Sequence, residues 1–260
     1  MPLPDTDYLS LNTHVPPFDD VRVRRAVNFA IDRHAVARLF GGPKFATPTC
    51  QLVPATVPGH EPYCPYTRSP SRKGRWVAPD LPRAHRLIAA SGTRGTAVTV
   101  WTQPGLPNDE ATGRYFGRLL ARLGYRARVR VLAHPRWVAV IDDPRRHPQV
   151  VTQGWIDSRA SAFISLSFGC AAWNPPAEMS NHAEFCDPAV DRLCRAAERL
   201  EATDPVAANR LWARADRRVT DAAPAVATVQ ESSPDLLSRR AGDYQSAPSI
   251  GVVLQRLWVR

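Results

Sequence analysis

The stretch YLSLNTHVPPFDDVRVRRAVNFAIDR, residues 8–33, decides how the rest of the sequence is interpreted. It opens with the alternating apolar pattern of a strand and breaks at Pro16-Pro17. Asp19 and Asp20 follow, and aspartates just before a helical apolar pattern cap the helix and favour its dipole. That pattern consists of Val23, Val27, Ala30 and Ile31. The stretch therefore predicts a strand, a turn and a helix.

Strand and helix patterns continue to alternate beyond this opening. Helices are predicted at 34–40, 79–91 and 109–123, and strands at 97–101, 126–132 and 149–155. Such alternation is typical of an α/β lobe with a mixed sheet. Further along, Asp187-Pro188 and Asp204-Pro205 each place a capping aspartate before a proline at the first helical position. A short strand is predicted at 225–229.

The sequence of residues 12–33 is more specific than a strand, a turn and a helix require. It reads Asn-Thr, three residues, Pro-Phe-Asp-Asp-Val-Arg-Val-Arg-Arg-Ala, three residues, Ala-Ile-Asp-Arg. It closely resembles the extracellular solute-binding proteins, family 5, of oligopeptide, dipeptide and nickel ABC importers. Asp187-Pro-Ala-Val-Asp-Arg-Leu and Ala223-Pro-Ala-Val resemble the C-terminal part of the same family. The segment from Pro48-Thr-Cys-Gln to Cys64-Pro-Tyr-Thr is similar to its actinobacterial members.

This resemblance implies a type II periplasmic-binding-protein-like fold: an α/β architecture of two lobes, of which one is nearly complete here and the other, the first lobe, lacks its N-terminal half. Residues 1–14 would form a hinge strand and a remnant of the first lobe. Residues 15–152 would form the ligand-binding α/β lobe. Residues 153–260 would be the C-terminal return segment of the first lobe. The strand at 225–229 is then expected to pair with a sheet that this chain does not encode.

Five cysteines are present, and none lies in a Cys-x-x-Cys arrangement that would indicate zinc. Cys50 and Cys64 bracket one proline-rich loop, and Cys170 and Cys186 bracket another. Each pair would close a loop of roughly 15 residues, and such bridges persist only in an oxidising compartment. We predict both disulfides, with free half-buried thiols as the alternative. Cys194 falls within a helix and is expected to be packed and unreactive.

The charge balance is strongly basic, with a formal net charge of +10, but the cations are dispersed along the chain. This favours a solvated surface over nucleic-acid binding. No apolar run approaches the ~20 residues of a membrane span, and the N-terminus lacks the features of a signal peptide. The family resemblance nevertheless implies an extracytoplasmic location, at the cell surface or in the periplasm.

Catalytic motifs are not found: there is no nucleophile elbow, phosphate-binding loop or zinc-protease helix. The seven histidines are scattered, without metal-ligand spacing. We expect no enzymatic activity, no metal and no cofactor.

The candidate binding site is the phrase Gly154-Trp155-Ile156-Asp157, which resembles the Gly-Trp-x-x-Asp crossover of the family. The resemblance implies that Trp155 lines the cleft and that Asp157 pairs with the positive end of a peptide-like ligand. Asp157 lies one residue closer to the tryptophan than usual, and Arg159 follows it. In the alternative interpretation, Trp155 anchors the core and Asp157 belongs to a turn. Asn12, in the first crossover, and Asn108, at a helix start, complete the predicted ligand-binding set.

Together these features predict a shortened substrate-binding component of an ABC importer, monomeric, that binds peptides or peptide-like solutes and delivers them to permease subunits. A sensor or regulatory module with the same fold, or a non-functional gene remnant, are the alternatives. Upstream genomic sequence distinguishes the three.

Overall fold

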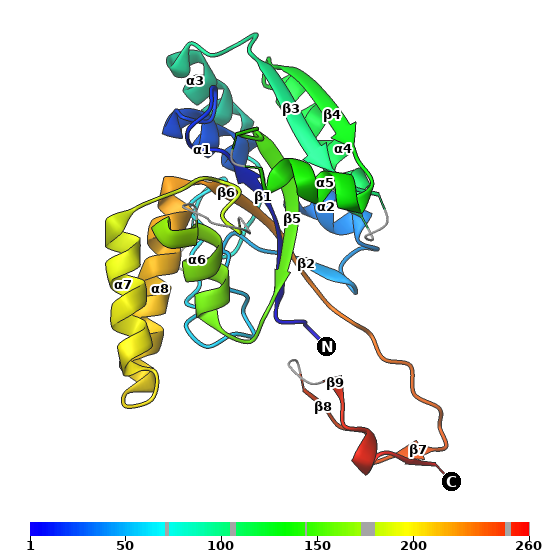
Figure 1. Ribbon diagram of the computed structural model, residues 1–260. Coiled ribbons are helices and arrows are strands. Elements are labelled where there is room, and N and C mark those ends of the chain that lie inside the picture. Colours follow the sequence, from blue (N-terminus) through cyan, green and yellow to red (C-terminus); the bar gives the residue numbers. More distant parts are fainter. Residues whose placement is uncertain (71–72, 105–107, 144, 173–179, 248–250, 260) are drawn as a thin grey trace.

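The computed structural model describes residues 1–70, 73–104, 108–143, 145–172, 180–247 and 251–259. A mixed sheet of six strands, in the order β2-β6-β1-β5-β3-β4, forms its centre (Figure 1). The strands are β1 (Asp5–Leu11), β2 (Ala46–Pro48), β3 (Ala97–Thr102), β4 (Arg126–Val131), β5 (Val150–Ile156) and β6 (Ala225–Glu231). The strand β1 runs antiparallel to both β5 and β6, whereas β3 runs parallel to β4 and β5. The sheet is therefore mixed, as predicted.

Eight α-helices accompany the sheet within the described ranges. They are α1 (Val21–Ala30), α2 (Arg33–Leu39), α3 (Leu81–Ser91), α4 (Asp109–Arg122), α5 (His134–Ile141), α6 (Ala160–Phe168), α7 (Pro188–Leu200) and α8 (Pro205–Ala222). The side chains of Asp20, Asp187 and Asp204 accept hydrogen bonds from the first turns of α1, α7 and α8. These three predicted caps are confirmed. None of these helices is both long and apolar enough to cross a bilayer.

Two apolar cores lie on either side of β1. One contains Leu9 and Leu11 of that strand and side chains from α1, α2, α3 and α4. The other contains Tyr8 and side chains from α6, α7 and α8, including the fully packed Trp212. Because successive residues of a strand point to opposite faces, β1 contributes to both cores. The elements on both sides are thus tied to one strand.

The expectation that the strand at 225–229 lacks its sheet is wrong. The strand β6 is hydrogen-bonded to β1 on one side and to β2 on the other, and all of its residues except Glu231 are buried. Val226 and Val229 belong to the first core and Ala225 to the second, so both of its faces are covered. The sheet is continuous across the boundaries predicted at 14/15 and 152/153, and the three-part division stays a prediction.

Beyond β6 the chain leaves this body and forms two small ribbons, β7 (Ala241–Gly242) with β10 (Trp258–Val259), and β8 (Ser246–Ala247) with β9 (Gly251–Val252). Figure 1 shows these ribbons apart from the sheet. Short 3₁₀ turns occur at Cys170–Ala172 and Leu254–Arg256.

Both predicted disulfides are present. The Cα atoms of Cys50 and Cys64 are 5.1 Å apart, and those of Cys170 and Cys186 are 4.4 Å apart. Both separations lie in the range that a disulfide requires. Cys194 is buried, and burial raises the pKa of its thiol to about 11, so it is unreactive at neutral pH.

Candidate functional site

Two adjoining hollows lie beside the central strands β1 and β5, with volumes of ≈ 580 and ≈ 270 Å³. They share Asp109, Gly154 and Trp155, and we call the two together the groove. The larger hollow has the size of many small-ligand pockets. Its other lining residues are Tyr8, Gln103, Trp137, Val138, Ile141, Asp142, Thr152, Gln153, Leu166, Ser180 and His182. The smaller is completed by Leu3, Asp5, Thr6, Asp7, Ile156 and Glu231.

The strand β5 positions the centre of the groove. Gln153 and Trp155 are two residues apart, so their side chains point to the same face of the sheet. In the antiparallel register Tyr8 is paired with Gln153, and Thr6 with Trp155. Gly154 lies between them, and a Cβ atom there would be 3.0 Å from Asp7 Oδ1. A side chain at this position would crowd the junction of the two hollows.

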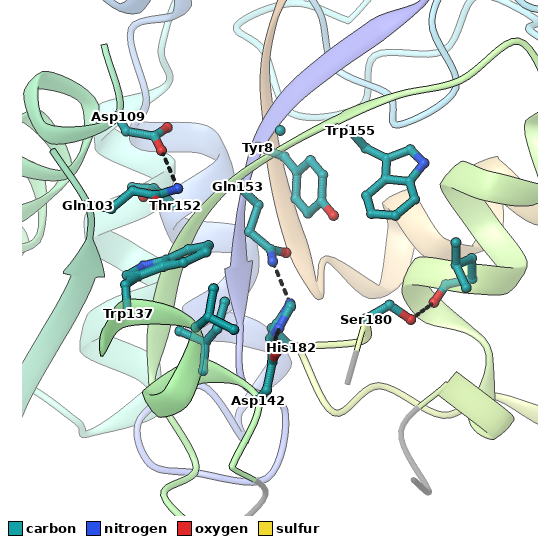
Figure 2. Close-up of a pocket in the computed structure, with 14 residues that line it drawn as sticks. Tyr8, Gln103, Asp109, Trp137, Asp142, Thr152, Gln153, Trp155, Ser180 and His182 are labelled. Carbon is teal, nitrogen blue, oxygen red and sulfur yellow. Dashed lines mark hydrogen bonds and ion pairs between the residues drawn. The ribbon is translucent and has the colours of Figure 1, made fainter. Parts of the chain in front are cut away.

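Aromatic side chains form much of the larger hollow's wall (Figure 2). Tyr8 is held against Phe168, with ring centroids 5.8 Å apart. Trp137, on α5, is stacked on His134 at 6.1 Å. Trp155 packs on the second core and faces both hollows. Such rings offer a large apolar surface to a ligand at a low entropic cost.

A polar network crosses the floor of the larger hollow. The Ser10 hydroxyl donates to Gln153 Oε1 at 2.9 Å, and the Gln153 amide donates to His182 Nδ1. His182 Nε2 in turn donates to Asp142 Oδ1 at 2.9 Å (Figure 2). The imidazole is 7% exposed. The network links β1, β5, α5 and the segment after residue 180, so their side chains are fixed before any ligand arrives.

Carboxylates dominate the polar lining of the smaller hollow. Burial raises the pKa of Asp5 to about 6, and burial with repulsion from Glu231 holds that of Asp7 well above its ordinary value. Burial also raises the pKa of Asp109 and of Glu231. Removing a carboxylate from water disfavours its charged form. The groove therefore holds several acids that lack full solvation.

Asp5, Asp7 and Glu231 also form the one group of potential metal ligands found among the described residues, with their oxygen atoms within 4.8 Å of one another. With one ligand atom from each residue, the three carboxylates supply three of the six to eight oxygens that Ca²⁺ takes. Clusters of acids without an ion are common, and we assign no metal to this one.

The structure separates the two residues of the predicted Gly-Trp-x-x-Asp phrase. Trp155 lines the groove, whereas Asp157 lines neither hollow. The Arg159 guanidinium donates to both Asp157 oxygens, at 3.2 and 3.3 Å, and lowers the pKa of that carboxyl. The backbone N–H of Asp157 donates to Pro4. The ligand-binding role of Asp157 stays a prediction. In this arrangement its carboxylate forms an ion pair with the exposed Arg159.

The two predicted asparagines also lie outside the groove lining. Asn12 is fully buried, and its amide donates to Glu184 Oε1 at 2.7 Å. Asn108 precedes α4 in a left-handed conformation (φ 78°), and its side chain makes no capping hydrogen bond. Asn108 is adjacent to Asp109, which does line the groove.

Sequence reasoning missed several lining residues, among them Trp137, Gln153 and His182. Gln153 could have been predicted, because it lies two residues before Trp155 in the same strand and its side chain therefore points to the same face. For Trp137 and His182 none existed, since they reach the groove from other elements. His182 was one of the scattered histidines to which no role was assigned, and it is buried in an irregular segment.

Comparison with known proteins agrees with this architecture. The sequence profile of the bacterial extracellular solute-binding proteins, family 5 Middle, matches residues 1–175. The glutathione-binding protein GsiB of Salmonella typhimurium is 26% identical over 249 residues, which are 94% of this chain and 46% of that protein. The chain thus spans about half the length of the curated relatives it matches.

Solved structures show the same fold. HbpA2 from Haemophilus parasuis superposes with a TM-score of 0.82 at 19% identity, over 100% of this chain and 49% of that one. The clavulanic acid biosynthesis oligopeptide binding protein 2 gives a TM-score of 0.79 at 24% identity, over 99% and 47%. The fold is the mixed α/β fold of type II periplasmic binding proteins, and this chain matches about half the length of those structures. The chain belongs to the bacterial extracellular solute-binding proteins of family 5.

Proposed function

We propose that this chain is the substrate-binding component of an ABC importer for peptides or peptide-like solutes. The observation that carries the proposal is the groove, whose aromatic walls surround a pre-formed polar network. Family membership supports it, and so do the names of relatives that bind glutathione or oligopeptides.

The groove acts by binding and not by catalysis. Tyr8, Trp137 and Trp155 supply apolar surface, and Gln153 and His182 supply oriented polar atoms. Binding sites of this kind use many apolar contacts for affinity and a few polar groups for orientation. We further propose an extracytoplasmic location, consistent with the two disulfides, a monomeric state, and delivery of the ligand to permease subunits.

Isothermal titration calorimetry of the 260-residue chain with a set of di- and tripeptides tests this proposal. Affinity in such proteins depends on enclosing the ligand, and this chain spans about half of its relatives. We therefore expect a dissociation constant of about 1 mM, a binding free energy of about −4 kcal/mol.

Trp155→Ala should weaken binding by about fivefold or more, because an aromatic contact contributes ~0.5–1.5 kcal/mol beyond its area. The matched control is Trp101→Ala, because Trp101 is a half-buried tryptophan of β3 that lines neither hollow. Absence of binding at millimolar peptide, or equal losses in the two variants, would contradict the proposal.

A further inference from the structure

The charge of the groove is opposite to that of the chain as a whole. The sequence carries a net charge of +10, yet neither hollow is lined by a lysine or an arginine among the described residues. Five carboxylates line the two hollows: Asp5, Asp7, Asp109, Asp142 and Glu231. The single histidine of the lining, His182, is already paired with Asp142.

Four of these five acids lack the ion-pair partners that other acids of the chain have. Surface carboxylates such as Asp20, Asp143 and Asp187 form ion pairs with arginines. Within the described part of the chain, Asp5, Asp7, Asp109 and Glu231 form no ion pair.

Asp109 is the best placed of these carboxylates. It is 9% exposed and is the one acid that lines both hollows. Among the described residues, the hydrogen bond that it accepts through its side chain comes from Gln103 Nε2, 3.2 Å from Oδ2 (Figure 2). Within the described part of the chain, its other oxygen, Oδ1, accepts no hydrogen bond. A carboxylate that is nine-tenths buried without a counter-charge is unfavourable unless something supplies one.

We infer that the groove selects cationic peptide-like ligands and that Asp109 binds their positive group. This inference rests on the proposed function and specifies its ligand class. Trp155 also lines both hollows, on the other side of Tyr8 and Gln153 from Asp109 (Figure 2), and an indole face attracts a cation. Asp5, Asp7 and Glu231 add attraction of the same sign at the far end of the groove. Asp157, which Arg159 neutralises, is not needed for this selection.

The inference accounts for the raised pKa values in the groove. Burial without a cation favours the protonated acids, and a bound ammonium or guanidinium would favour the ionised forms. The ligand would then be the missing counter-charge of these carboxylates.

Three tripeptide amides of similar size test the inference by calorimetry at neutral pH. Ala-Lys-Ala amide carries two positive charges, its N-acetyl form carries one, and N-acetyl-Ala-Gln-Ala amide carries none. We expect affinity to rise with charge, with the doubly charged peptide bound at least about tenfold more tightly than the neutral one. Equal affinities, or tighter binding of the neutral peptide, would overturn the inference while leaving peptide binding itself intact. Absence of binding by all three would reject the proposed function, and the inference with it.

Asp109→Asn should abolish most of this charge preference while keeping the size of the side chain. The matched control is Asp143→Asn, which removes a carboxylate that is paired with Arg145 and lies outside the groove. A preference that survives in Asp109→Asn, or that is lost equally in the control, would overturn the role of Asp109. Circular dichroism verifies that both variants are folded. If either variant does not fold, the titration of the unmodified chain with the three peptides still tests the inference.

Discussion

Replacing Arg33 with methionine should destabilise the whole fold, because this side chain joins segments that are far apart in the sequence. Arg33 begins α2 and is 0% exposed. Its Nε donates to the carbonyl oxygens of Thr49 at 2.7 Å and Ala227 at 2.9 Å, and its Nη2 donates to Asn28 Oδ1 at 3.3 Å. Burial lowers the pKa of the guanidinium to about 9, which still leaves it charged at neutral pH.

The magnitude follows from the single Nε–H, which is shared between the Thr49 and Ala227 carbonyl oxygens, and from the weaker Nη2 contact. Each hydrogen bond to a charged group contributes ~1.5–3 kcal/mol, and removing one partner leaves the buried carbonyl without that donor. Relief of the buried charge offsets part of the loss. We therefore expect Arg33→Met to lower the free energy of unfolding by about 3 kcal/mol. Arg33→Lys should recover only part of this, since one ammonium cannot replace the planar fork.

Urea unfolding followed by circular dichroism measures the change. The control is Arg38→Met, five positions along the same helix. The exposed Arg38 side chain is 3.9 Å from Asp32 and should contribute less than about 1 kcal/mol. Equal unfolding midpoints for Arg33→Met and Arg38→Met would refute the reasoning, and with it the coupling of α2 to β6 through Ala227.

Two further outcomes are expected. Alkylation of the unfolded, unreduced protein should modify one thiol, that of Cys194, as counted by mass spectrometry. Alkylation after reduction should modify all five cysteines. Five alkylated cysteines without reduction would exclude the two disulfides. Burial raises the pKa of Asp216 to about 7, whereas in the unfolded chain this carboxyl loses its proton near pH 4. Between these two values the folded state binds more protons than the unfolded state. The free energy of unfolding should therefore fall as the pH rises from about 4 to about 7. Asp216→Asn should flatten this fall, and an unchanged slope in thermal unfolding across that range would contradict it.

Local features of the fold could be predicted from the sequence because they depend on neighbouring residues. The caps at Asp20, Asp187 and Asp204 require only a side chain and the backbone two or three positions along. The disulfides were predictable because each pair closes a short loop. Strand periodicity likewise located β3, β4 and β5.

Long-range pairing could not be predicted in the same way. The strand β6 pairs with β1 across more than two hundred residues, and its own pattern does not state which neighbours cover its two faces. The groove has the same limitation. Trp155 was identified through the family resemblance, whereas Asp109, Trp137 and His182 come from three other segments. Asp157 was expected in the site, and the adjacent Arg159 holds it elsewhere.

The groove can be tested most directly through the indole N–H resonances of the seven tryptophans. The chain, labelled with ¹⁵N, is titrated with Ala-Lys-Ala amide, and the peaks are assigned by single tryptophan-to-phenylalanine variants. The resonances of Trp137 and Trp155 should shift with ligand concentration, because both side chains line the groove. The resonance of Trp212 should stay in place, because Trp212 packs in the second core, lines neither hollow, and donates its Nε1–H to Glu201 at 3.0 Å. Shifts confined to other tryptophans, or no shift at saturating peptide, would contradict the assignment of the groove as the binding site.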